Sequence, residues 1–176
     1  MHELRHFTIK SVDDVQPGEL FTMSLAGASA TCIALHGNQA EPDQFVAVVL
    51  ISDFADEQHP FYSRIIRDGE SVMSFGRDWV LDLTDDSSCF TGMVSLSEEP
   101  GVVAVDSRGT TMRVARPPRQ MTSSPARVDL REFKLGGRVT NGCETLFPSW
   151  KIWTSEAEAT RLGAKPLFEF TSPAKR

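Results

Sequence analysis

The chain has 176 residues, of which 40% are hydrophobic and 24% are charged. This length and composition are typical of one globular domain that folds without disulfides or a structural metal. The formal net charge of −6 disfavours broad, non-specific nucleic-acid binding. The longest apolar run, Phe45 to Ile51, is far shorter than the roughly 20 residues of a membrane-spanning helix. We therefore expect a single β-rich domain over residues 1–176, with no membrane contact.

The cysteines and the N-terminus predict the compartment. Cys32, Cys89 and Cys143 are too few, and odd in number, for a secreted disulfide framework. Residues 1–6 lack the apolar run of a signal peptide. Both observations favour a cytoplasmic protein.

Charge is spread unevenly along the chain. Residues 1–106 hold 18 acidic and 5 basic side chains, a balance of −13. Residues 107–138 hold 8 basic and 2 acidic side chains, a balance of +6, and seven of the eight basic residues are arginine. Such a distribution indicates either a surface for an anionic partner or a basic segment that neutralises the protein's own acidic half.

The elements predicted along the chain are almost all short strands, because apolar and polar residues alternate with a period of two. We expect strands at residues 20–25, 30–36, 45–51, 62–67, 70–75, 79–83, 102–106, 110–115, 127–135, 147–153 and 167–171. The run at 45–51 is apolar on both faces, which is typical of a central, fully covered strand. A short turn is expected at residues 12–15.

Local turn signals predict how some strands pair. Asp68-Gly69 between 62–67 and 70–75 suits a type I′ hairpin turn. Ser107-Arg108-Gly109 similarly joins 102–106 to 110–115. The strand ending at His36 is expected to pair with the one starting at Phe45.

One helix has a clear start signal. Ser155 and Glu158 form a capping box, and Leu162-Gly163 supplies a C-terminal stop. The whole pattern predicts an antiparallel β-barrel or sandwich of about ten short strands with one short C-terminal helix. The segment Pro17-Gly18-Glu19-Leu20-Phe21 resembles the opening of many SH3-like small barrels, a pattern that unrelated proteins share, and it implies no residue roles.

The first candidate site is the arginine-rich region 108–138. Its candidate contact residues are Arg113, Arg116, Arg119, Arg127 and Arg131. Residues 116–127 are rich in proline, arginine and serine and are expected to form an exposed loop. Arginine binds phosphate or carboxylate through two parallel hydrogen bonds, so these residues suit an anionic ligand or an acidic partner. The alternative is a solvated loop and strand edge that balance neighbouring acids.

Two further candidates have weaker patterns. His36, Asp53 and His59 carry ligand types that zinc or iron(II) accepts. Their spacing matches no compact metal motif, however, so an ordinary polar loop is the favoured interpretation. On a strand, Trp150 and Ile152 point to one face, while Lys151 and Trp153 point to the other. Trp153 is thus a candidate stacking platform for a ligand, against the alternative that both faces are covered core.

Three functions remain open. The leading hypothesis is a binding or interaction module that contacts an anionic ligand or acidic partner through region 108–138. The second is an enzyme with a histidine and aspartate site, with or without metal, in a barrel mouth. The third is a self-assembling structural subunit whose acidic and basic faces pair between copies. No nucleotide or cofactor motif occurs in the sequence, so no cofactor is expected.

Overall fold

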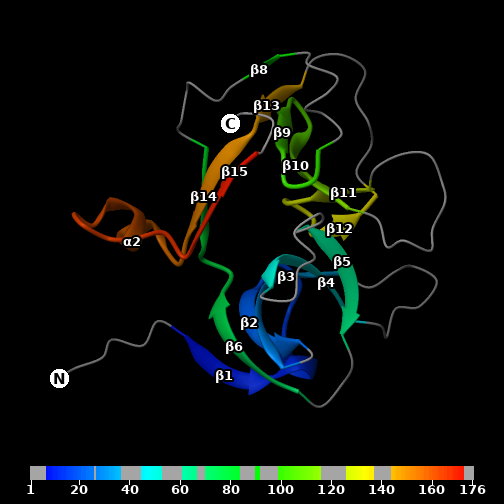
Figure 1. Ribbon diagram of the computed structural model, residues 1–176, viewed down its shortest axis with the longest axis vertical. Coiled ribbons are helices and arrows are strands. Elements are labelled where there is room, and N and C mark those ends of the chain that lie inside the picture. The colour runs from blue at the N-terminus through cyan, green and yellow to red at the C-terminus, as the bar shows by residue number, and fades with distance from the viewer. Residues whose placement is uncertain are drawn as a thin grey trace.

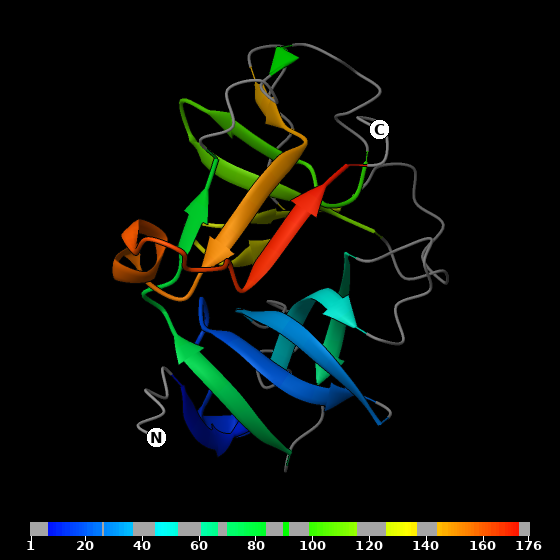
Figure 2. The same ribbon diagram turned by 60° about the vertical axis from the view of Figure 1, so that its left-hand side comes forward.

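The computed structural model describes residues 7–25, 27–36, 45–52, 61–66, 70–83, 90–91, 99–115, 126–136 and 144–172. Antiparallel strands dominate this part of the chain and form three sheets, and Figure 1 labels most of the strands. The sheets stack in a sandwich-like arrangement, not in a closed barrel, which confirms the predicted fold class. Figure 2 shows the second and third sheets together, above the first.

The strands of each sheet follow a simple neighbour order. The first sheet contains β1 (Thr8–Ser11), β6 (Ser71–Gly76), β2 (Leu20–Leu25), β3 (Ala28–Leu35), β4 (Phe45–Ser52) and β5 (Tyr62–Ile66). The second contains β12 (Lys134–Leu135), β11 (Ala126–Asp129), β10 (Gly109–Val114), β9 (Val103–Asp106), β13 (Thr145–Phe147) and β8 (Phe90–Thr91). The third contains β15 (Phe168–Thr171), β14 (Ser149–Trp153) and β7 (Val80–Asp82). A 3-10 turn, η1 (Val12–Asp14), follows β1, as expected for residues 12–15.

Strand β4 shows why the first sheet needs cover on both faces. Val46, Val48 and Leu50 join the core shared with the second and third sheets. Ala47 and Val49 join a separate core on the opposite face. This confirms the prediction of a strand covered on both faces, since all five side chains are buried.

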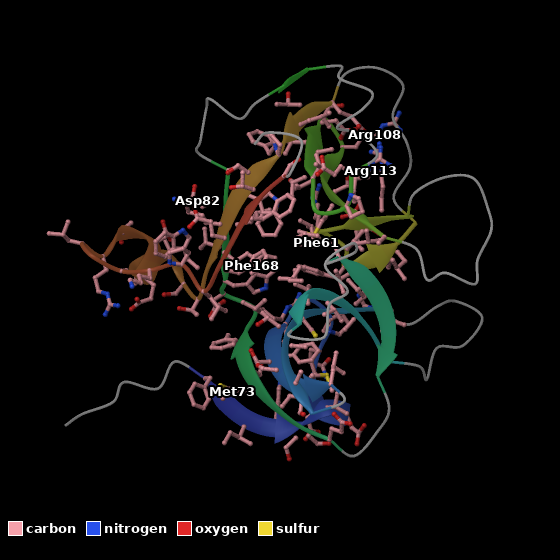
Figure 3. All side chains as sticks on the ribbon, viewed as in Figure 1. Phe61, Met73, Asp82, Arg108, Arg113 and Phe168 are labelled. Atoms are coloured by element: carbon pink, nitrogen blue, oxygen red, sulfur yellow. The ribbon has the colours of Figure 1, made fainter. Side chains whose placement is uncertain are left out.

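An aromatic cluster fills the space between the sheets. The Phe61 ring meets those of Trp150 and Phe170 edge-on, with centroids 5.9 and 4.8 Å apart. Figure 3 shows Phe61 and Phe168 turned toward each other between the sheets, and their centroids are 6.2 Å apart. Gly101 lies against this cluster, and its carbonyl accepts a hydrogen bond of 2.7 Å from Trp150 Nε1. Trp150 therefore belongs to the core between the sheets.

Polar contacts also join the sheets. His36 N donates to the carbonyl of Phe133 at 2.8 Å, and Trp79 Nε1 donates to the carbonyl of Gly18 at 2.8 Å. The Phe133 ring lies directly over Gly18, where a Cβ would approach it to 2.6 Å. Phe133 has φ of 52°, an uncommon value for a bulky residue. These contacts hold the turn after β11 against the first sheet.

Several local predictions are confirmed. Strands β3 and β4 pair antiparallel, and β9 and β10 form a hairpin in which Asp106 lies opposite Gly109. Helix α2 (Glu156–Thr160) begins at Ser155, whose Oγ accepts from Glu158 N at 3.2 Å.

The predicted hairpin between residues 62–67 and 70–75 is wrong. Strand β5 pairs with β4, whereas β6 pairs with β1 and β2. β5 and β6 therefore lie at different places in the sheet order, because β6 enters between β1 and β2 and buries Val72 and Ser74 there. The single strand expected at 127–135 is also two strands, β11 and β12, separated by a turn.

Candidate functional site

The arginines of region 108–138 divide into buried and exposed side chains. Arg113 on β10 and Arg127 on β11 lie directly opposite each other in register. Their residues are only 5% and 3% exposed. Met112 and Val128 point into the core between the sheets, so the two guanidinium groups occupy the other face of the second sheet. The structure thus places both arginines inside the protein, away from the exposed contact surface expected of them.

Arg127 is held by a carboxylate. Its Nη1 and Nη2 donate to the two carboxylate oxygens of Glu144, the second at 3.0 Å. Both side chains are largely buried, and Glu144 immediately precedes β13. This two-pronged pair neutralises one arginine of the basic segment with a carboxylate that lies outside the acidic residues 1–106.

Two exposed arginines are presented by turns of the same kind. Asp106 Oδ1 accepts from the backbone N–H groups of Arg108 at 2.7 Å and Gly109 at 3.1 Å. Asp129 Oδ1 accepts from those of Arg131 at 2.8 Å and Glu132 at 2.9 Å. Each turn is an Asx turn with arginine two residues after the aspartate. Each aspartate thereby fixes the backbone that carries an exposed guanidinium.

The two turns lie at one end of the second sheet. Thr111 pairs with Asp129, and Leu130 N donates to the carbonyl of Thr110 at 2.9 Å. Among the described residues, neither Arg108 nor Arg131 forms an ion pair.

Arg116 and Arg119, like the rest of 116–125, lie outside the described residues. The loop expected at 116–127 is shorter than predicted, because β11 already begins at Ala126.

Trp153 is half-buried on the outer side of β14. Its Nε1 donates to Asp82 Oδ2 at 3.2 Å on the neighbouring strand β7. Lys151, on the same side of β14, pairs with Glu169 at 3.8 Å. The indole is therefore fixed by a polar contact across the third sheet, and its role as a stacking platform stays a prediction.

The proposed metal ligands are not brought together in the described structure. His36 is exposed at the end of β3, and its backbone N–H is bonded to Phe133. Asp53 and His59 lie outside the described residues. Within the ranges that the structure describes, no three histidine, cysteine, aspartate or glutamate side chains form a group able to hold a metal.

A charged cluster at the rim of the first sheet was missed by sequence reasoning. The buried carboxylate of Glu19 accepts from Lys10 Nζ at 2.8 Å, from Ser74 Oγ at 2.6 Å and from Gln16 N at 3.1 Å. Lys10, Glu19, Ser74 and Phe75 line a hollow of about 340 Å³. Nothing in the sequence signals the cluster, because Ser74 is 55 residues away from Glu19.

The contacts of Glu19 set its ionisation. Burial acts to raise the pKa of its carboxyl group, but the hydrogen bonds from Lys10, Ser74 and Gln16 and the Lys10 charge together hold the pKa below its ordinary value of 4.5. Glu19 is therefore a charged, structural group at neutral pH.

A change of Glu19 to glutamine is expected to lower the free energy of unfolding at pH 7 by about 1–3 kcal/mol, because the ionised acceptor of three hydrogen bonds is lost. The folded pKa is depressed, so this stabilisation is fully present above pH 4.5 and disappears as the pH falls through the lower folded pKa. Urea unfolding of wild type and Glu19→Gln at several pH values between about 2 and 7 measures it. The exposed Glu70→Gln serves as control; a wild-type advantage that grows toward acid pH would contradict the prediction.

Comparisons with protein-family models, with curated proteins and with solved structures found no match to this chain. No helix among the described residues is long and apolar enough to cross a membrane. The fold and candidate site thus define an all-β, sandwich-like protein with two arginine-bearing Asx turns at one end of its second sheet.

Proposed function

We propose that the protein is a binding module that contacts an anionic ligand or an acidic partner protein through the exposed arginines of region 108–138. The observation that carries this proposal is the pair of Asx turns that present Arg108 and Arg131 at the same end of the second sheet. Arg116 and Arg119 belong to the proposed contact by their place in the sequence. Arg113 and Arg127 support the sheet from within and do not touch the ligand.

The proposal rests on the difference between the two sets of arginines. A guanidinium already bonded to a buried carboxylate, as in Arg127, has little capacity left for an external anion. An exposed guanidinium on a fixed turn keeps its donors available, and less entropy is lost when the backbone is ordered before binding. A cytoplasmic location remains a prediction from the cysteine count.

The change of both Arg108 and Arg131 to alanine is expected to weaken binding of a glutamate decapeptide about tenfold or more, since each lost charged contact removes part of the attraction. Isothermal titration calorimetry at low and high salt measures the affinity, which should fall with salt in wild type. Inorganic pyrophosphate in a parallel titration distinguishes a small anion from an acidic polypeptide.

The matched control removes two exposed arginines elsewhere, Arg77 after β6 and Arg161 after α2, and leaves the net charge equal to that of the test variant. Equal losses in both double variants would mean that only total charge matters, and the proposed contact would be wrong. Failure of wild type to bind either anion would also exclude it.

A further inference from the structure

Among the described strands, β1 leaves its outer edge free. β1 is the first strand in the order of the first sheet, and no described strand lies on its other side (Figures 1 and 2). We propose that this edge binds an extended segment of a partner protein, which adds a strand beside β1, places an apolar side chain next to Ile9 and carries a basic residue at one end. This surface is separate from the arginine-bearing turns.

An exposed apolar pair marks the edge. Ile9 on β1 lies directly opposite Met73 on β6, and the two residues are 66% and 36% exposed. Figure 3 shows Met73 far from the Phe61 and Phe168 rings that fill the core. Directly opposed and adjacent side chains on a sheet face stabilise strand pairing, so an apolar residue on an added strand gains contact here.

The charge that would oppose strand addition is already neutralised. Proteins commonly protect sheet edges with charged side chains, as β12 does, where Lys134 pairs with Glu132 at 3.3 Å and both are exposed. The one charged residue of β1, Lys10, instead points to the inner face and pairs with Glu19 at 2.6 Å. Covering this edge therefore leaves no isolated charge in an apolar contact.

The hollow at the rim provides space for the other face of an added strand. Thr8 and Lys10 of β1 line it, together with the rings of Phe7 and Phe75, whose centroids are 6.3 Å apart. Side chains alternate between faces along a strand. On the added strand, the residue next to Ile9 faces the same way as Ile9, so the residues before and after it face the hollow. Recognition by strand addition typically combines backbone hydrogen bonds with such pockets for alternate side chains.

Charge complementarity indicates the ends of the segment. Asp13 and Asp14 follow β1 directly and are exposed, as is Glu70. Val12 N donates to the carbonyl of Glu70 at 2.9 Å, so the three carboxylates are carried by adjoining segments. A lysine or arginine at the corresponding end of the partner segment meets this acidic border.

The size of the edge favours a peptide segment over a second copy of the chain. β1 has four residues, and pairing such a short edge buries far less than the roughly 1,200 Å² of total surface that stable interfaces between globular proteins require. An extended segment needs no such area, because backbone hydrogen bonds supply much of its affinity.

The test uses the acetylated and amidated hexapeptide Lys-Lys-Thr-Ile-Thr-Ile, whose lysines lie beside Asp13 and Asp14 when the peptide pairs antiparallel to β1, and amide chemical-shift titration of the 176-residue chain. We expect shifts centred on β1 and β6, and about a tenfold or greater loss of affinity when alternate peptide nitrogens are methylated, because methylation removes strand hydrogen bonds but keeps the side chains. Ile9→Thr should weaken binding about fivefold. The fully exposed Leu162, in the turn after α2, provides the control, since Leu162→Thr removes a similar side chain and should change nothing.

Replacing Asp13, Asp14 and Glu70 by their amides should weaken binding of this peptide but not of a version in which two threonines replace the lysines. The proposal is overturned if the methylated peptide binds as well as the parent, or if wild type shows no shifts at about 1 mM peptide. Self-association that depends on Ile9 in the absence of peptide, seen by analytical ultracentrifugation, would assign the edge to a second copy of the chain and also overturn it.

Discussion

Gly101→Ala is expected to lower the free energy of unfolding by about 2–4 kcal/mol. Gly101 has φ of 87°, a left-handed value that alanine adopts only at a cost. In addition, a Cβ at this position would lie 2.4 Å from Phe61 and 2.7 Å from Phe170. Because these rings are packed between the sheets, they cannot move aside without opening the core, and the overpacking adds to the backbone strain.

Urea unfolding of Gly101→Ala and Gly27→Ala separates the two causes. Gly27 has φ of 88°, yet a Cβ there would have no heavy atom within 4 Å. Its substitution should therefore cost only the backbone term, about 1 kcal/mol. Equal losses in the two variants would show that the aromatic cluster accommodates the methyl group and that the close approach is unimportant.

Glu144→Gln is expected to destabilise the protein by about 3–5 kcal/mol, because it leaves the charge of a buried guanidinium without its carboxylate. Arg127 donates to both oxygens of Glu144, and its side chain is almost wholly inaccessible. The midpoint of urea unfolding at pH 7 measures the loss.

Two variants test the cause of this loss. Glu132→Gln breaks the exposed pair with Lys134 and should change stability by less than about 0.5 kcal/mol. The double variant Arg127→Met with Glu144→Met removes both charges and should be more stable than Glu144→Gln alone. If the double variant is the less stable protein, the destabilisation comes from lost packing and not from the buried charge.

Local sequence signals predicted much of the fold. The two-residue alternation located most strands, and the capping pair Ser155 and Glu158 located the helix, because these signals act between residues a few positions apart. The β9–β10 hairpin followed for the same reason. Very short strands such as β12 were not separated from their neighbours, since two residues show no period.

The pairing of strands far apart in the sequence was not predicted correctly. Asp68-Gly69 has the composition of a hairpin turn, but β6 pairs with β1 and β2, where Ser74 reaches the buried Glu19. Turn preference contributes little compared with the burial and hydrogen bonds gained in the sheet. A turn motif carries no information about the contact between Ser74 and Glu19, because these residues are separated by 55 positions in the sequence.

The sequence by itself determined the all-β class, the alternating faces of β14 and the concentration of arginine in region 108–138. Only the tertiary structure decided which arginines face solvent. Arg113 and Arg127 are buried on neighbouring strands, and folding brings Glu144 to Arg127. Arg108 and Arg131 lie on exposed turns at the end of the sheet. The sequence gives the charge of each side chain. Whether that charge can reach a binding partner depends on burial and on ion pairs within the protein, and both are set by folding.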